Sequence, residues 1–216
     1  IITNREVLSY DSAANEFRED DTKIKVPPGY GVSTLLEDPQ TGNYWIGSDS
    51  GLALYDVHAQ EVYYRRHNPR GIPILSMPAF QDPVTVSFID QQNRFWVATW
   101  NVFAEGEKFF CYDLNANQLL PDTLGLKPAE RSYKELHSFF QQSSGRLWAY
   151  GRMIFSEYDA RQQRFHYIRN DHIDDYGIRY GTVYCVIEDK EENVWIGTDE
   201  GAYVFNPGRE KFNTVL

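Results

Sequence analysis

The chain of 216 residues has 31 acidic and 21 basic side chains and a formal net charge of −10 at pH 7. This charge argues against the phosphate backbone of a nucleic acid, and against an anionic lipid surface, as a partner of this region. Aromatic residues make up 15% of the sequence, which favours an all-β interior because flat rings fill the space between stacked sheets.

Residues 1–20 predict an incomplete unit of short strands. The pair Tyr10-Asp11 is followed by Phe17, and the same spacing returns near the end of the chain at Phe205-Asn206 and Phe212. In this alignment the chain starts inside a second strand. We therefore expect the first unit to lack its inner strand.

Residues 32–68 predict the first complete unit of four strands separated by turns. An apolar run leads to a turn with Gly42, a short strand around Trp45 and a third strand that ends at Asp56. A fourth strand completes the unit before the basic stretch at 65–70.

Residues 85–120 and 136–169 predict two more units of the same order. The first of them carries an insertion at 99–108, between its second and third strands. Long connections separate the units, and connections of this length are usually functional or disordered. We expect a short helix in one of them, starting near Pro128.

Residues 182–216 predict the last unit. Val183, Cys185 and Ile187 alternate with other residues and are expected to share one face of its first strand. Cys111 and Cys185 are both expected to be buried thiols that form no disulfide. Glu192 stands where the other units have Gly or Asn, so its turn is expected to differ or to be strained.

Four tryptophans set the register of the units, at spacings of 51, 52 and 47 residues, and each follows an acidic or amide residue by six or seven positions. They are Trp45, Trp96, Trp148 and Trp195. A bulky ring at one point of every unit predicts packing between neighbouring units. Four-strand units with periods of about 40–50 residues are typical of β-propeller blades. We predict an all-β propeller of four-stranded antiparallel blades, as an incomplete arc of about four and a half blades.

The repeat, written D-x-x-G-x-h-W-[IV]-G-[TS]-x-x-G-[LA]-x-x-[YF]-[DN], closely resembles the two-component regulator propeller repeat. Asp38 to Asp56 and Asp189 to Asn206 match it best. The middle units depart from its W-I-G-T centre, with Trp96-Val97-Ala98-Thr99 and Trp148-Ala149-Tyr150-Gly151. WD-repeat and sialidase patterns do not occur at this register.

The resemblance implies the periplasmic sensor region of a hybrid two-component system histidine kinase/response regulator. Such a region binds oligosaccharides from glycan breakdown and is itself non-catalytic, whereas the parent chain is a kinase. The implied partners are the ligand, the remainder of the propeller and the parent sensor chain, through which alone this region would meet a membrane. A homodimer is a further option.

In a propeller, ligands are expected where the connections into the first strands meet the turns between second and third strands. The aromatic and basic residues expected there suit sugars. They are Arg70, Trp100, Tyr133, Arg152, Arg179 and Tyr180. Their alternative role is structural, with Trp100 covering its own insertion and the arginines offsetting the acidic surface.

No metal site, cofactor or catalytic residue is predicted. The acidic segment 170–175 lacks the spacing of a Ca²⁺ loop and favours a solvated turn. The basic stretch 65–70 favours an exposed loop. Two other functions stay open. One is a propeller enzyme, a lyase or hydrolase, that acts on polysaccharide, although the mostly apolar inner strands argue against it. The other is a protein-interaction platform.

Overall fold

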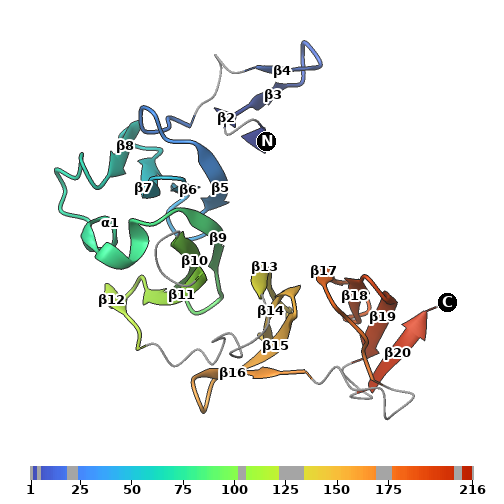
Figure 1. Ribbon diagram of the computed structural model, residues 1–216. Coiled ribbons are helices and arrows are strands. Elements are labelled where there is room, and N and C mark those ends of the chain that lie inside the picture. Colours follow the sequence, from blue (N-terminus) through green and yellow to red (C-terminus); the bar gives the residue numbers. More distant parts are fainter. Residues whose placement is uncertain are drawn as a thin grey trace. The chain divides into compact units, whose positions relative to one another are not determined.

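The computed structural model describes most of the chain in seven segments, which are residues 2–3, 6–18, 24–101, 106–121, 134–168, 177–206 and 211–215. By its internal contacts the chain divides into two compact units, Ile1–Leu120 and Pro121–Leu216. Each unit is described by itself, with its elements labelled in Figure 1.

The first unit begins with two small antiparallel sheets. One pairs β1 (Ile2–Thr3) with β2 (Glu6–Val7), and the other pairs β3 (Ser9–Asp11) with β4 (Glu16–Arg18). Tyr10 lies opposite Phe17, as Phe205 lies opposite Phe212 in the last sheet of the chain. These segments therefore pair as the second, third and fourth strands of a blade do.

Two four-stranded antiparallel sheets follow in the first unit, each with its strands side by side in chain order. The first comprises β5 (Val32–Glu37), β6 (Tyr44–Ser48), β7 (Gly51–Asp56) and β8 (Glu61–Tyr64). The second comprises β9 (Val84–Ile89), β10 (Arg94–Asn101), β11 (Gly106–Asp113) and β12 (Gln118–Leu119). β10 and β11 are eight residues long, so part of the insertion at 99–108 extends these two strands.

The second unit holds two more sheets of the same topology. One comprises β13 (Glu135–Gln141), β14 (Leu147–Arg152), β15 (Ile154–Asp159) and β16 (Arg164–Tyr167). The other comprises β17 (Val183–Glu188), β18 (Val194–Thr198), β19 (Gly201–Asn206) and β20 (Lys211–Val215). The prediction of an all-β chain built from four-stranded antiparallel sheets is confirmed.

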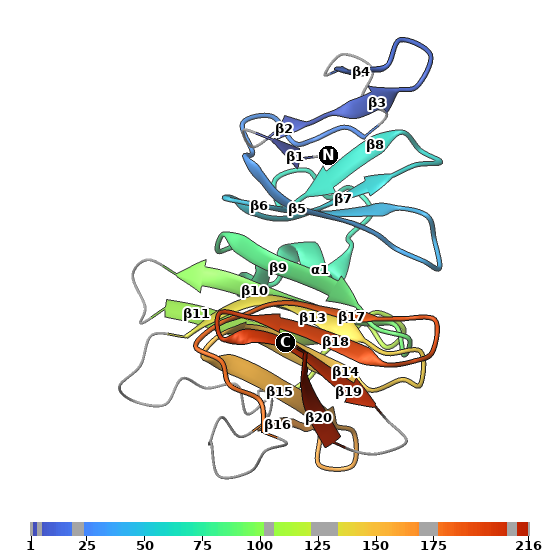
Figure 2. The same cartoon turned by 90° about the vertical axis from the view of Figure 1, so that its right-hand side faces the viewer.

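The connection from β8 to β9 is packed into the core of the first unit. It holds α1 (Pro73–Ser76) and the 3₁₀ turn Pro78–Phe80, each opened by a proline whose fixed φ suits a first helical turn. Ile74, Leu75 and Phe80 are buried in one cluster with residues of both sheets, and Figure 2 shows α1 next to β9. This connection is therefore structural. The helix predicted near Pro128 lies outside the described residues.

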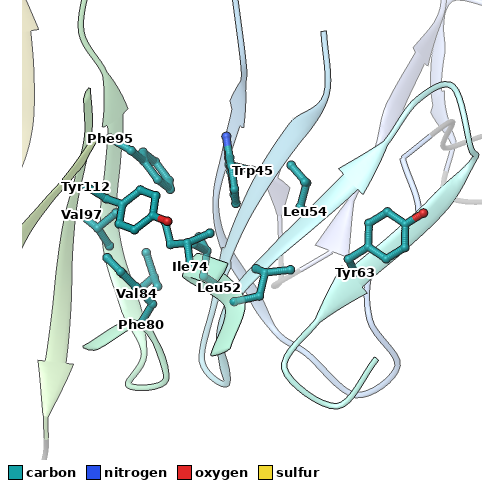
Figure 3. Packing of buried hydrophobic residues seen from close by; sticks show 11 residues of the cluster. Trp45, Leu52, Leu54, Tyr63, Ile74, Phe80, Val84, Phe95, Val97 and Tyr112 are labelled. Atoms are coloured by element: carbon teal, nitrogen blue, oxygen red, sulfur yellow. The ribbon is translucent and has the colours of Figure 1, made fainter. Parts of the chain in front are cut away.

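Aromatic rings join the two four-stranded sheets of the first unit. The Trp45 and Phe95 ring centroids are 5.0 Å apart, and Leu52, Leu54 and Tyr112 complete the contact (Figure 3). In the second unit, Trp148 meets Phe205 at 5.9 Å. Trp45, Trp96 and Trp148 are buried, whereas Trp195 is half-buried.

A β-bulge recurs in the first strand of each four-stranded sheet. In β17 the pairing passes from Val183 opposite Thr198 to Cys185 opposite Gly197, which leaves Tyr184 as the extra residue. The bulge shifts the alternation by one position. Val183 and Val186 are buried, but Cys185 is exposed and Ile187 is 58% exposed. The expected shared face of Val183, Cys185 and Ile187, and the expected burial of Cys185, are therefore wrong.

The turn between first and second strands uses one left-handed residue in every four-stranded sheet. Gly42, Asn93, Gly145 and Glu192 have φ angles of 69°, 60°, 92° and 64°. Glu192 thus adopts the same conformation as its counterparts, although left-handed backbone is unfavourable for a residue with a Cβ. Of the two alternatives for this turn, strain is the one observed.

Candidate functional site

The two ends of each sheet differ in the connections that they carry. We call the end where the first strand begins, and where the turn between second and third strands lies, the first-strand end. In the β5–β8 sheet this end is tied together by Asp49, whose carboxylate accepts the Gly31 N–H at 3.1 Å and whose own N–H donates to the Gly31 carbonyl at 3.0 Å. This is the end at which the sequence predicts a ligand.

A pocket of about 460 Å³ lies at the first-strand end of the β5–β8 sheet. It is lined by Pro28, Gly29, Tyr30, Ser50, Arg65, Arg66 and Gln81. We call it the β5–β8 pocket. Its residues come from the connection into β5, the β6–β7 turn and the connection that leaves β8, so three separate segments build it.

The connection into β5 enters the pocket as a tight turn. The Tyr30 N–H donates to the Pro27 carbonyl at 3.1 Å, and Gly29 has a φ of 78°. Proline at the second position and glycine with positive φ at the third are the pattern of a type II turn. The turn sets the Tyr30 ring edge-on to Tyr64, with the ring centroids 5.4 Å apart.

The two arginines stand at the tip of a second tight turn. Tyr64 and His67 exchange two backbone hydrogen bonds of 3.0 and 2.8 Å, so Arg65 and Arg66 are the two residues between them. His67 is fixed in addition by a 2.8 Å contact between its Nε2 and Oε1 of Glu61. The backbone that presents both guanidinium groups is therefore held at both ends.

Ser50 and Gln81 are held by a close approach of two chain segments. A Cβ built on Gly51 would lie 2.6 Å from the Phe80 carbonyl oxygen and 3.0 Å from Cα of Gln81. Gly51 also has a φ of 100°. Only glycine meets both conditions, and its absence of a side chain lets the β6–β7 turn sit against the connection that carries Gln81.

The β5–β8 pocket is lined by positively charged side chains and hydrogen-bond donors. Within the described part of the chain neither Arg65 nor Arg66 forms an ion pair or a hydrogen bond through its guanidinium group. Burial raises the pKa of Tyr30, and the positive charge of Arg66 opposes this shift. The phenol therefore stays protonated at neutral pH and can donate a hydrogen bond.

Two residues predicted as ligand contacts have other places in the structure. Arg70 Nη1 lies 2.6 Å from Oδ2 of Asp56, at the end of β7 and hence at the opposite end of the sheet. The chain reverses at Tyr64–His67 and runs back along β8, so Arg70 lies away from the first-strand end. Tyr180 is 5% exposed, packs against Phe155 and donates its hydroxyl to the Ile168 carbonyl at 2.9 Å. Arg70 and Tyr180 therefore have structural partners within the protein and do not line the β5–β8 pocket, and their role as ligand contacts stays a prediction.

The remaining predicted contacts are not among the residues that line the β5–β8 pocket. Trp100 is half-buried near the end of β10, and its backbone N–H donates to the Pro83 carbonyl at 2.8 Å. Arg152 and Arg179 are both exposed in the second unit. The Arg152 backbone forms an isolated antiparallel β-bridge with Thr182, and the Arg179 carbonyl accepts a hydrogen bond from the Thr198 hydroxyl. Tyr133 lies outside the described residues.

The position of two segments that line the β5–β8 pocket could be predicted from the sequence. Arg65 and Arg66 lie near the end of the predicted unit 32–68, and Tyr30 lies two residues before its predicted first strand at Val32. The topology of a blade brings these two places to the same end of a sheet. Sequence reasoning assigned the basic stretch to a solvated loop, and it did not single out Tyr30, Ser50 or Gln81.

Among the described residues no group of three or more His, Cys, Asp or Glu side chains is placed to hold a metal ion. The acidic segment 170–175 lies outside that part of the chain. In the segments that the structure describes, no helix has both the length and the apolar character needed to span a membrane.

Repeated four-stranded antiparallel meanders with a shared tryptophan register are the blades of a β-propeller. Residues 177–200 match the family described as "Two component regulator propeller", which confirms the resemblance of the repeat. No curated protein matches the chain.

Three solved structures of similar fold give the context. The extracellular domain of the putative hybrid two component system BT3049 from B. thetaiotaomicron has a TM-score of 0.65 at 18% identity, over 96% of this chain and 26% of that one. The extracellular domain of BT4673 from the same organism has a TM-score of 0.63 at 14% identity, over 98% and 25%. PorZ, described as a surface component of the type-IX secretion system of Porphyromonas gingivalis, has a TM-score of 0.67 at 14% identity, over 98% and 31%.

The chain thus spans about a quarter of the length of the first two of these structures. At these identities the likeness establishes the propeller fold.

Proposed function

We propose that this chain is the ligand-sensing, extracytoplasmic propeller region of a hybrid two-component signalling protein, and that it binds glycan-derived oligosaccharides without transforming them. The observation that carries the proposal is the two component regulator propeller repeat at residues 177–200. The proposal includes a periplasmic location and a parent chain with histidine kinase activity. The extracellular domains of BT3049 and BT4673 support it by their fold.

The β5–β8 pocket supports a binding role. Its volume of about 460 Å³ falls within the range of about 300–1,000 Å³ usual for small-molecule sites. An aromatic ring and several hydrogen-bond donors suit a sugar, because the ring can cover apolar C–H faces while the donors meet oxygens. The lining residues include no carboxylate, imidazole or thiol, which favours binding over catalysis in this pocket.

The test is a thermal-shift screen of the 216-residue chain against neutral, acidic and sulfated oligosaccharides. A ligand at a hundred times its dissociation constant stabilises the folded state by about 2.7 kcal/mol, which gives a readable shift. We expect at least one sugar to raise the melting temperature and to be recovered intact. A sugar that is consumed would instead establish a propeller enzyme, and no response from any sugar would favour the protein-interaction platform.

A further inference from the structure

We infer that the β5–β8 pocket recognises an oxyanion on its ligand, either the carboxylate of a uronic acid or a sulfate ester. This inference rests on the proposed function and specifies the ligand class. It is carried by two arginines whose side chains have no ion-pair or hydrogen-bond partner among the described residues, and which line one pocket together with Tyr30 and Ser50.

Four of the other arginines in the described chain pair with carboxylates. Such ion pairs join Arg18 to Glu16, Arg70 to Asp56, Arg94 to Asp90 and Arg146 to Glu157. Arg65 and Arg66 have no such partner among the described residues, although the chain carries ten more acidic than basic side chains. Two adjacent arginines that lack carboxylates in an acidic protein are free to bind an external anion. Arg forks match carboxylate and sulfate oxygens in geometry as well as in charge.

The turn geometry brings both arginines to the pocket in spite of their adjacency. In an extended strand neighbouring side chains point to opposite faces. Arg65 and Arg66 instead occupy the two central positions of the turn between Tyr64 and His67, and both line the pocket. Because the turn is closed by two backbone hydrogen bonds, its backbone loses little further conformational entropy when an anion binds.

The negative charge of Asp49 acts on the pocket, because after burial it is among the causes that raise the pKa of Tyr30. Its carboxylate is engaged by the Gly31 N–H and by the Ser50 hydroxyl at 3.0 Å. The positive charges of Arg65 and Arg66 both act on Tyr30 in the direction opposite to that of Asp49. Tyr30 also lines the pocket, and its protonated hydroxyl adds a neutral donor.

The experiment measures the affinity of the 216-residue chain by calorimetry for five probes. They are a disaccharide with one glucuronic acid, the methyl ester of that disaccharide, an O-sulfated disaccharide with its unsulfated parent, and inorganic sulfate. We expect the free acid or the sulfated sugar to bind at least about tenfold more tightly than its neutral counterpart, since hydrogen bonds to a charged partner are roughly twice as strong as neutral ones. Whether the acid or the sulfate ester gains more identifies the source of the oxyanion.

The variant R65Q/R66Q keeps hydrogen-bond donors and removes both charges. It should reduce affinity for the anionic sugar by about tenfold or more, leave the neutral sugar unchanged, and abolish the salt dependence of binding. The matched control is R161Q/R164Q, which removes two exposed charges from the β15–β16 hairpin in the second unit. Unliganded melting temperatures of both variants verify that each is folded.

The outcomes separate this inference from the proposed function. Equal binding of charged and neutral sugars, or full anionic-sugar binding by R65Q/R66Q, would overturn the inference and leave the sensing function standing. Binding of inorganic sulfate that depends on Arg65 and Arg66, with no sugar bound, would support an anion site and overturn the sugar ligand. Absence of binding by every probe would overturn both.

Discussion

The indole Nε1 of Trp96 donates a 2.8 Å hydrogen bond to Oδ2 of Asp90, six positions earlier in the chain. Trp195 repeats the contact with Asp189 at 2.7 Å. In these two sheets the acidic residue that precedes the tryptophan therefore has a physical role. It closes the turn between first and second strands and accepts the hydrogen bond of the indole N–H.

The other two sheets lack this bond for different reasons. In the β5–β8 sheet the turn has one more residue, so Asp38 precedes Trp45 by seven positions and caps the turn amides of Gln40 and Thr41. In the β13–β16 sheet Gln142 replaces the aspartate. The Nε1 atoms of Trp45 and Trp148 are buried and have no hydrogen-bond partner in the described chain.

The difference between the sheets predicts unequal effects of one substitution. Asp90→Asn should destabilise the fold by about 1–3 kcal/mol, because it removes a buried charge-assisted acceptor of both Trp96 and Arg94. Asp38→Asn keeps an acceptor for its turn and should cost less than about 1 kcal/mol. Urea unfolding of the two variants measures the difference, and equal losses would contradict the role of the Trp96 bond.

The left-handed Glu192 predicts a stabilising substitution. Glu192→Gly should raise the free energy of unfolding by up to about 1 kcal/mol, since glycine adopts a φ of 64° without a Cβ penalty. Its backbone carbonyl, which accepts Gln142 Nε2, is retained. Glu191→Gly is the control in the same turn and should destabilise, because no left-handed strain is relieved there. A lower melting temperature for Glu192→Gly would be inconsistent with strain at this position.

Two glycines beside the β5–β8 pocket should respond differently to a methyl group. Gly51→Ala places a Cβ against the Phe80 carbonyl as well as in left-handed backbone, and should cost about 2–4 kcal/mol. Gly29→Ala meets no atom within 4 Å and should cost only the conformational part, about 1 kcal/mol. Chemical denaturation compares the two, and a Gly51→Ala variant as stable as Gly29→Ala would show that the connection before β9 shifts freely.

Stability should fall on acidification. The hydrogen bond from Trp195 is the largest cause that lowers the pKa of Asp189, with Asn193 contributing further bonds. A carboxyl group with a depressed folded-state pKa stabilises the fold above its unfolded pKa of about 3.9, and this contribution is lost as the pH falls through the folded-state pKa. Asp189→Asn should therefore lose less stability than the parent chain between pH 5 and 2, measured by urea midpoints. Parallel curves would contradict the linkage.

The two thiols should differ in reactivity. Burial raises the pKa of Cys111 to about 12, whereas Cys185 is exposed beside the bulge in β17. At pH 8 a chromogenic disulfide reagent should titrate one thiol in the native chain and a second one only in denaturant. Cys185→Ser should remove the fast thiol and leave the slow one. Two fast thiols, or none, would contradict the placement of β17.

The register of the strands could be predicted from the sequence because it depends on local spacing. Tryptophan, acidic turn residue and third-strand aromatic recur at fixed distances, and these distances define the four-stranded sheets. The side of each first strand that faces the core could not be predicted, because one bulged residue, such as Tyr184, inverts the alternation without changing the composition.

The candidate site depended on where connections travel between strands. Arg70 was assigned to the first-strand end on the assumption that the connection after β8 stays there, but the turn at Tyr64–His67 sends the chain back toward Asp56. The same turn places Arg65 and Arg66 in the pocket. Such a reversal depends on contacts between segments that are distant in the chain. These contacts cannot be predicted from a single sequence.

The bulges bear on how these sheets avoid association with other chains. Each first strand is an edge strand of its sheet, and an edge with regular unpaired amides invites a strand from a second molecule. Ser33, Thr85, His137 and Tyr184 interrupt that regularity at the same place in all four sheets, and all four are exposed. The irregular backbone at each of them makes a poor template for intermolecular β-pairing, so the repeat carries its own protection against aggregation.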